Sequence, residues 1–277
     1  MATTAPFMQV SDLSFAFPGA QQPGLDDVSL TLASGQVTAI VGANGAGKTT
    51  LARHLVGILR PPPGTVTLGG RDLATLHSAD LARQVGYVFQ YPEHQFVGGS
   101  VLDDVAYGLR RAGVAESEAK SRALAMLEEF GLLSLAQAHP FSLSHGEQRR
   151  LSVAAMLVLG QRGLFLDEPT FGQDRRNSDL LLDKLADLTA DGHAIVAITH
   201  DMRLVAERAN RVIAMSEGRI VFDGAPDGLF GDAALLRNAR LRPPPITQVG
   251  QRLGLRTPWL RISDAISAVE SALEFAS

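Results

Sequence analysis

The stretch VTAIVGANGAGKTTLARHLVGIL, Val37 to Leu59, carries the strongest structural signal in the chain. Its first six residues are an apolar, β-branched run, which is the pattern of a buried strand. Its last ten residues, TLARHLVGIL, have the spacing of a helix. Between them, GANGAGKT matches the pattern G-x-x-x-x-G-K-[ST] in full, and a strand before and a helix after it are the context that this pattern requires. The stretch therefore predicts a phosphate-binding loop at the end of a strand.

Each part of this loop has a chemical task. The glycines let backbone N–H groups curl around phosphates, Lys48 reaches the β- and γ-oxygens of a nucleotide, and Thr49 offers a hydroxyl to Mg²⁺. A glycine turn with a chance lysine is the alternative, and the two flanking elements disfavour it. We assign nucleotide contacts to Gly42, Asn44, Gly45, Gly47, Lys48, Thr49 and Thr50.

The segments on both sides of the loop predict an α/β fold. Before it, FMQVSDLSFAF and DVSLTLASG carry the alternation and turn residues of antiparallel strands. Far after it, apolar strands alternate with a helix in RGLFLDEP, SDLLLDKLADLTA and HAIVAITH, which predicts a parallel sheet with crossover helices. The segment RVIAMSEGRIVFDG is typical of a hairpin.

The middle of the chain changes character. SVLDDVAYGLRRAG and ESEAKSRALAMLEEFG both have helical spacing and end at a glycine, and no strand pattern interrupts them. We therefore expect a helical subdomain inserted at about residues 91–150.

Two apolar strands of the second half end in polar residues. Asp167 and Glu168 close GLFLDEP, and His200 closes VAITH. Acids often simply open a solvated loop, and a lone histidine is more often a satisfied structural residue. Beside a phosphate loop, however, ligands gather at the carboxyl ends of the strands. We expect Asp167 to hold Mg²⁺ and Glu168 to orient and polarise an attacking water.

The stretch LSHGEQRR, Leu143 to Arg150, precedes another apolar helix. Ser144 and Glu147 have the spacing of a capping box. A helix start is also an anion site, because its N–H groups are free and its dipole is positive there. From these residues alone, the segment either only caps a helix or also contacts a phosphate.

Composition limits the classes of function. The 277-residue chain has 45% hydrophobic residues, which suits a full core, and its net charge of −4 argues against nucleic acid as a partner. Cysteine is absent, so thiolate metal sites and disulfides are excluded. The start MATTAPFMQV lacks the pattern of a secretory signal, and no apolar run approaches the roughly 20 residues that cross a bilayer. We therefore expect any work at a membrane to go through a partner.

The order of these motifs resembles the ATP-binding cassette (ABC) ATPases. Phosphate loop, VFQ, helical insert, LSHGEQRR, LFLDEPT, FGQD and ITHD follow one another as in that family, from Met8 to about Gly224. The resemblance implies a P-loop ABC ATPase fold over residues 1–225, with a parallel core sheet, an N-terminal antiparallel β subdomain and the helical insert. It implies ATP and Mg²⁺ as ligands.

The resemblance also assigns roles by position. It implies that Phe17 stacks on adenine, that Gln90 lies near Mg²⁺ and the water, and that His200 meets the γ-phosphate. Three further residues belong to motifs that face the nucleotide of the other subunit in this family: Ser144, Gly146 and Asp174. A complete pair of sites then needs a second ATPase chain, identical or related.

Two stretches narrow the resemblance. VFQYPEHQFVGG is similar to the switch loop of energy-coupling-factor (ECF) importer ATPases, although Tyr91 replaces the usual asparagine. The extension 226–277 looks like their C-terminal extension, with a proline run and a last helix whose Ile266, Val269 and Leu273 we expect to face inward. The alternative is an unrelated tail that packs on its own domain. We expect this extension to support pairing of two cassettes.

The function expected from the resemblance is ATP hydrolysis that powers a membrane importer, of ECF type, for a vitamin or a transition-metal ion. Its partners would be integral membrane subunits, and it would lie peripherally at the cytoplasmic face of the cell membrane. Two other classes remain open, a soluble ABC ATPase of the cluster-assembly type and a nucleotide switch that barely hydrolyses. Glu168 argues against the switch.

One departure from the family bears on the signature stretch. The usual LSGGQ is LSHGE here, with His145 in place of the first glycine. The exchange matters if that position needs a backbone conformation that favours glycine.

Overall fold

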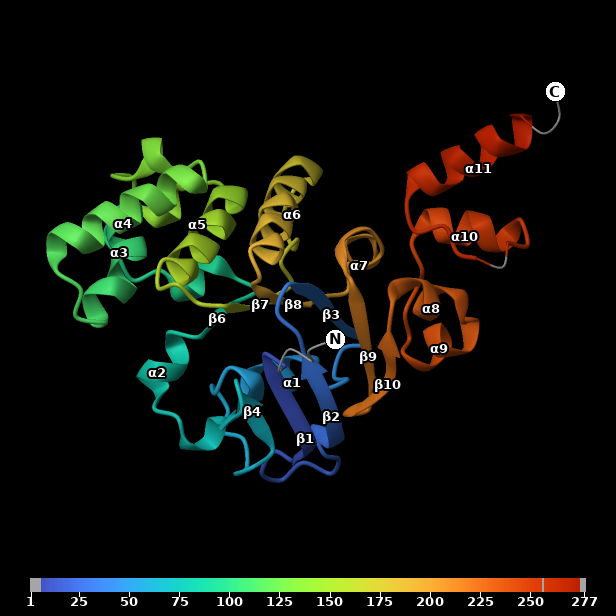
Figure 1. Ribbon diagram of the computed structural model, residues 1–277, viewed down its shortest axis with the longest axis horizontal. Coiled ribbons are helices and arrows are strands. Elements are labelled where there is room, and N and C mark those ends of the chain that lie inside the picture. Colours follow the sequence, from blue (N-terminus) through green and yellow to red (C-terminus); the bar gives the residue numbers. More distant parts are fainter. Residues whose placement is uncertain (1–5, 256, 275–277) are drawn as a thin grey trace.

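A mixed sheet forms the centre of the molecule (Figure 1), in a computed structural model that describes residues 6–255 and 257–274, with the backbone alone for 272–274. Its strand order is β10-β9-β3-β8-β7-β6. Neighbours from β9 to β6 run parallel, and β10 pairs antiparallel with β9. The strands are β3 (Gln36–Gly42), β6 (Val85–Val88), β7 (Gly163–Asp167), β8 (Ala194–Ile198), β9 (Arg211–Ser216) and β10 (Arg219–Gly224).

Both faces of this sheet are buried, which explains the continuous apolar runs of its strands. In β7, Leu164 and Leu166 pack into one hydrophobic cluster and Phe165 into another, because successive side chains point to opposite faces. Ile195 and Val196 of β8 divide in the same way. The parallel order brings the carboxyl ends of β3, β6, β7 and β8 to one edge, as the sequence predicts for the core sheet.

A smaller antiparallel sheet, of order β2-β1-β4-β5, covers one side of the core together with α1 (Figure 1). Buried and exposed residues alternate along its two long strands, so one face packs inward and the other meets solvent. This sheet confirms the expected N-terminal antiparallel subdomain. Its elements and neighbours are β1 (Met8–Phe15), β2 (Leu25–Leu32), α1 (Lys48–Leu55), β4 (Val66–Leu68), β5 (Arg71–Asp72) and α2 (Ser78–Ala82).

The green part of the molecule in Figure 1 consists of helices and the loops that join them. The three long ones are α3 (Val101–Arg111), α4 (Glu116–Glu129) and α5 (His145–Leu157). Between Val88 and Gly163, a stretch described in full, the chain forms helices and loops without a strand. Gly113 and Gly131 have positive φ at the ends of α3 and α4, which is why each helix stops there.

The other side of the core sheet carries α6 (Arg175–Ala190) and α7 (Met202–Arg208), which follow β7 and β8 (Figure 1). The C-terminal segment, orange to red in the figure, forms α8 (Pro226–Gly231), α9 (Ala233–Asn238), α10 (Pro245–Arg252) and α11 (Ile262–Glu274). Leu229 and Phe230 of α8 anchor it in the cluster under β9. Among the described residues, no helix combines the length and apolar character that a membrane span requires.

The last helix differs from the expectation. Ile266 and Val269 are 53% and 54% exposed, so the prediction that they face inward is wrong within this chain. The Leu273 side chain lies outside the described residues. The physical reason is position, since α11 lies beside α10 at the far end of the molecule and not against the core sheet (Figure 1).

Candidate active site

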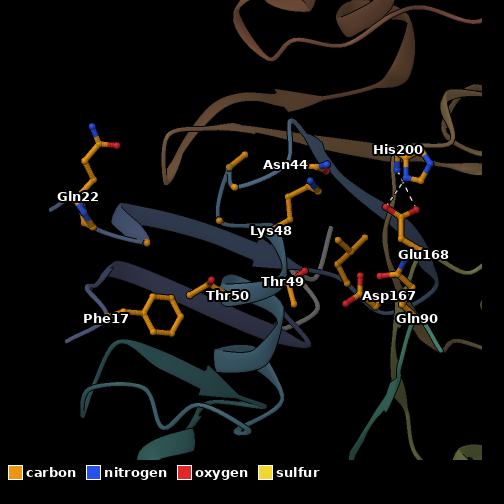
Figure 2. Close-up of a pocket in the computed structure, with 16 residues that line it drawn as sticks. Phe17, Gln22, Asn44, Lys48, Thr49, Thr50, Gln90, Asp167, Glu168 and His200 are labelled. Atoms are coloured by element: carbon orange, nitrogen blue, oxygen red, sulfur yellow. Dashed lines mark hydrogen bonds and ion pairs between the residues drawn. The ribbon is translucent and has the colours of Figure 1, made fainter. Parts of the chain in front are cut away.

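The main pocket opens at the carboxyl edge of the parallel sheet and has a volume of about 620 Å³. Figure 2 shows Phe17 at one end of this pocket, Glu168 and His200 at the other, and the phosphate loop between them. The residues that line it are Phe17, Gln22, Pro23, Gly24, Asn44, Gly45, Ala46, Gly47, Lys48, Thr49, Thr50, Gln90, Asp167, Glu168, Ile198 and His200. All but four of the sequence-predicted site residues therefore line one pocket, and those four are Gly42, Ser144, Gly146 and Asp174.

Two glycines of the loop are required by space as well as by conformation. Gly42 has φ 145°, and a Cβ there would lie 2.3 Å from the carbonyl oxygen of Met215. Gly47 has φ 100°, and a Cβ there would lie 2.6 Å from the carbonyl oxygen of Gly24. Gly42 does not line the pocket, and it serves the site by letting β3 pass close to β9.

Lys48 opens α1 and points across the pocket (Figure 2). Its Nζ donates to the carbonyl oxygens of Gly42 at 2.8 Å and Ala43 at 3.0 Å. Burial lowers the pKa of Lys48, and the carboxylates of Glu168 and Asp167 oppose that shift. The site thus holds a largely buried ammonium group opposite two carboxylates, which suits a ligand with its own negative charge.

Asp167, at the end of β7, is held by a hydrogen bond from the neighbouring strand β6. The Tyr87 hydroxyl on β6 donates to its Oδ2 at 2.8 Å. Burial raises the pKa of Asp167, and the hydrogen bond from Tyr87 opposes that rise. Burial also raises the pKa of Tyr87 itself, so the phenol keeps the proton that it donates.

Glu168 has a left-handed backbone, with φ 47°, which is unusual for a residue with a side chain and typical of functional positions. Its Oε2 accepts from the Thr199 hydroxyl at 3.0 Å and from the His200 backbone N–H at 3.3 Å. Its Oε1 lies 2.7 Å from Nδ1 of His200 (Figure 2). The His200 side chain is 70% exposed, whereas that of Glu168 is only 13% exposed. The carboxylate is therefore held among protein groups, whereas the imidazole contacts it from the solvent side.

The residues that line the pocket suit Mg²⁺ bound together with phosphate. Thr49, Gln90 and Asp167 offer a hydroxyl, an amide and a carboxylate oxygen to the same cavity. Mg²⁺ in nucleotide sites takes one or two carboxylates and completes its shell with phosphate oxygens and water. Within residues 6–255 and 257–274, no cluster of three or more His, Cys, Asp or Glu side chains could hold a metal by itself. The site therefore fits a metal that arrives with its nucleotide.

The far end of the pocket is apolar and open. Phe17 is 45% exposed and lines the cavity, and its ring contacts Phe15 edge-on at 4.8 Å between centroids. Gln22, Pro23 and Gly24 complete this end, and sequence reasoning did not include them. The turn signal Pro23-Gly24 before β2 is the only local hint of their place.

Ser144, Gly146 and Asp174 do not reach this pocket. Ser144 and Glu147 form the predicted capping box at the start of α5. Gly146 packs so tightly that a Cβ would lie 2.5 Å from Cγ of Asn177, and Asn177 in turn donates to both carboxylate oxygens of Asp174. These residues thus form one cluster at the starts of α5 and α6, separate from the pocket of their own chain.

The backbone at His145, which stands in place of the first glycine of the usual LSGGQ, does not need a conformation that favours glycine. His145 is the first residue of α5 and does not have a positive φ. A side chain at this position therefore costs no backbone strain.

Three residues near the pocket were not predicted from the sequence. Tyr87 and Thr199 hold the two carboxylates, and Arg149 donates to the carbonyl groups of Asp167 and Glu168. Tyr87 lies on β6, three residues before Gln90, and Thr199 directly follows β8, one residue before His200, so proximity along the chain is a usable signal. Arg149 had no such signal, because it lies about 20 residues from its partners.

Comparison with known proteins places these observations in a family. A family model described as ABC transporter matches residues 25–171. The chain is 37% identical over 273 residues to the cobalt import ATP-binding protein CbiO of Rhodobacter capsulatus, covering 95% of this chain and 96% of that protein. It is 36% identical over 258 residues to the energy-coupling factor transporter ATP-binding protein EcfA2 of Methanospirillum hungatei, covering 91% of this chain and 65% of that protein.

Solved structures agree with the sequence matches. The structure of cbiO1 from Clostridium perfringens, described as part of the ABC transporter complex cbiONQ, superimposes with a TM-score of 0.76 at 28% identity, covering 90% of this chain and 99% of that one. Some curated relatives are much longer, and the chain spans 42% and 44% of the length of two of them.

Proposed function

Because this chain belongs to the ABC transporter family of ATP-binding subunits, we propose that it binds and hydrolyses ATP and thereby powers a membrane importer. The observation that carries the proposal is the catalytic end of the pocket. Glu168 is held by two donors on one oxygen and contacts the exposed imidazole of His200 with the other, opposite the buried ammonium group of Lys48. This arrangement suits activation of a water beside a triphosphate.

ATP would lie along the pocket with its base at Phe17 and its phosphates in the loop before Lys48. Thr49, Gln90 and Asp167 would hold Mg²⁺, which neutralises charge on the phosphate oxygens when bound. In this pose the γ-phosphate lies near Glu168 and His200.

The two oxygens of Glu168 would divide the work. Thr199 and the His200 N–H keep Oε2 in place. When the exposed imidazole of His200 turns toward the phosphate, Oε1 is free to accept a hydrogen bond from the attacking water and to take its proton. His200 would then stabilise charge on the γ-phosphate.

A second ATPase chain would complete the site. The cluster of Ser144, Gly146 and Asp174 carries a helix start with free N–H groups, but it lies outside the pocket of its own chain. We propose that residues 1–225 form the nucleotide-binding cassette. In a pair of such cassettes, this cluster would contact the nucleotide bound by the other chain, which is a second copy or a related chain.

The importer role receives support from relatives. The closely matched CbiO is named a cobalt import ATP-binding protein, and EcfA2 is named an energy-coupling factor transporter protein. We propose ECF-type uptake of a transition-metal ion or a vitamin, with integral membrane subunits as partners and a peripheral position at the cytoplasmic face of the membrane.

Replacing Glu168 by Gln tests the catalytic assignment. Glu168→Gln removes the proton acceptor and keeps the shape, so turnover should fall on the order of a hundredfold or more while ATP binding remains. Phosphate release by the purified protein gives turnover, and calorimetry gives ATP affinity.

Glu128→Gln, on the exposed side of α4, is the matched control and should keep full turnover. Normal turnover in Glu168→Gln would remove this residue from the mechanism. An inactive wild-type protein that binds ATP normally and is assayed with its membrane partner would contradict the proposed hydrolysis.

A further inference from the structure

Arg149 is the largest fully buried side chain among the described residues, with no exposed surface. It lies on the second turn of α5, directly after the segment that carries Ser144 and Gly146. Burying a guanidinium group is costly unless its donors are satisfied. The contacts that satisfy it therefore indicate what this part of the fold holds in place.

All its partners are backbone carbonyl groups. Nε donates to Pro169 at 3.1 Å, and Nη2 donates to Asp167 at 2.8 Å and also to Glu168. Nη1 donates to the carbonyl oxygen of Phe89, the residue before Gln90. Among the ion pairs of residues 6–255 and 257–274, none includes Arg149. The planar guanidinium group of Arg149 thus joins α5 to the ends of β6 and β7.

The guanidinium group of Arg149 stays charged although it is buried. Burial lowers the pKa of Arg149 to about 10, and the carboxylates of Asp167, Glu168 and Glu93 oppose the shift. The group therefore remains a cation at neutral pH, and its hydrogen bonds to the carbonyl groups are charge-assisted.

The atoms that Arg149 holds are those whose position matters most for hydrolysis. Glu168 has a left-handed φ of 47°, and its backbone N–H donates to Ile198 while its carbonyl group accepts from Arg149. A strained backbone persists only where its surroundings hold it on both sides. The contact to Phe89 fixes the chain directly before Gln90 in the same way.

We propose that Arg149 is a positioning residue that fixes the backbone of Glu168 and the approach to Gln90, and so links the start of α5 to the hydrolysis site. The proposal rests on the proposed function, because it assumes that Glu168 activates water. It implies that Ser144 and Gly146 of this chain contact the nucleotide bound by a second chain. That contact is made by α5, the same helix whose Arg149 positions Glu168 of this chain.

Arg149→Lys and Arg149→Gln test this role. Lysine keeps the charge but cannot span two strand ends, because its ammonium group lacks the planar fork. We expect both variants to bind a fluorescent ATP analogue within about twofold of wild type, since Arg149 does not line the pocket and its hydrogen bonds go to other segments. The kcat of ATP hydrolysis should fall ten- to hundredfold, because small displacements of a catalytic group are costly.

Arg122→Gln is the matched control. Arg122 also donates to a backbone carbonyl group of this helix region, at 2.8 Å to Val158, but at the end far from the site. It should keep the wild-type kcat and KM. Equal losses of kcat in Arg122→Gln and in Arg149→Lys would mean that any loosening of the helical part has the same effect, which contradicts a specific role for Arg149.

A distance measurement separates positioning from general stabilisation. The chain has no cysteine, so Gln9→Cys on β1 and Ala125→Cys on α4, both exposed, can carry spin labels without further changes. Electron paramagnetic resonance should give a broader distance distribution when Arg149→Lys is added, and an unchanged one when Arg122→Gln is added.

The proposal fails if Arg149→Lys keeps both the wild-type kcat and the wild-type distance distribution. That result differs from failure of the proposed function, in which the wild-type chain itself would not hydrolyse ATP in the same assay. If Arg149→Gln does not fold, Arg149→Lys decides the matter, with ATP-analogue binding as the check on its fold.

Discussion

At the scale of single residues, Phe15 at the end of β1 packs toward the core, and Phe17 just after the strand is available to a ligand. Phe17 is 45% exposed and lines the pocket, whereas Phe15 packs against the hydrophobic cluster and meets His54 edge-on at 4.7 Å. A spacing of two residues would put both on one side of a strand, so the sequence alone leaves the choice to the resemblance, but in the structure β1 ends at Phe15 and Phe17 lies in the loop after it. The exposed ring is the one available to a base.

Phe17→Ala should weaken ATP binding by roughly 1–3 kcal/mol, the range for a base stacked on an aromatic side chain. Phe17→Tyr should be mild, since the ring remains. Calorimetric titration with ATP measures the effect, and thermal unfolding checks that the fold is unchanged. Phe15→Leu is the comparison, and a loss of affinity there without a loss in Phe17→Ala would reverse the assignment.

His54 makes stability depend on pH. It is fully buried, its Nδ1 lies 2.8 Å from the Thr50 carbonyl oxygen, and its Nε2 has no hydrogen-bond partner. Burial lowers its pKa in the fold, opposed by the Thr50 bond. Below the unfolded pKa of about 6.5 the unfolded chain therefore binds the proton more readily, and the free energy of unfolding falls as pH falls.

Denaturant unfolding at pH 7.5 and 5.5 measures this dependence. The wild type should lose stability on acidification, by up to about 1.4 kcal/mol per pH unit from this group. His54→Gln should lose less over the same range, while the exposed His77→Gln should behave like wild type. Burial raises the pKa of Asp104, so this group makes the free energy of unfolding rise as pH falls. The contribution is the same in all three proteins, and the comparison therefore isolates His54. An equal pH response in His54→Gln and wild type would contradict the prediction.

At the scale of elements, the segment between β6 and α3 offers a surface for a membrane partner. Phe96 lies in this segment, but it is partly buried against the helical core and meets Phe141 edge-on at 5.9 Å, so its ring is already engaged within the chain. The exposed apolar side chains nearby are Tyr91, Val97 and Phe141, the last at 58%. Aromatic side chains with polar neighbours are common interface anchors, so we expect Phe141 to carry this contact.

Phe141→Ala should keep the ATPase activity of the purified chain and lose assembly with the membrane subunit, because the side chain is exposed and lies outside the pocket. Purification of the tagged chain from solubilised membranes, together with solute uptake, measures this. Ile58→Ala, which removes a similarly exposed apolar side chain after α1, should assemble normally. A wild-type chain found only with soluble partners would favour the cluster-assembly alternative.

At the scale of the whole molecule, the exposed stripe of α11 bears on pairing of two chains. Ile262, Ile266 and Val269 are 59%, 53% and 54% exposed and share one face of the helix. The same helix lies far from the phosphate loop (Figure 1), so a role in chemistry is disfavoured. We expect this stripe to meet a second chain and to support the pairing proposed for the extension 226–277.

Ile266→Asp together with Val269→Asp should keep the fold and ATP binding, since both side chains are already exposed, and should weaken the dimer formed with ATP. Light scattering after size exclusion measures the association. The control is Ser263→Asp with Ser267→Asp, which adds the same charge to another face of the helix. Undiminished pairing in the Ile266 and Val269 variant would show that α11 is not needed for the dimer.

Local spacing was enough to predict the parts of this protein that depend on neighbours along the chain. The strand and loop that begin at Val37, the helix that follows and the capping box of Ser144 and Glu147 all follow from periodicity, glycine placement and side chains three or four residues apart. The helix is shorter than predicted, since it ends at Leu55 and not at Leu59. The ends of α3 and α4 at glycines follow in the same way. The order of motifs then indicated the family, because each motif needs only its own few residues.

Only the tertiary structure decided which of these residues meet. Gln90, Glu168 and His200 follow the ends of three different strands, and they share a pocket with Lys48 because β3, β8, β7 and β6 are neighbours in the sheet. Strand order and burial depend on contacts between distant segments, which local spacing does not encode. Arg149 is the clearest case, since its hydrogen-bond partners Pro169 and Phe89 lie 20 and 60 residues away. In α11, by contrast, the helical spacing predicted a buried face, and the apolar side chains are exposed because the helix does not pack on the core sheet.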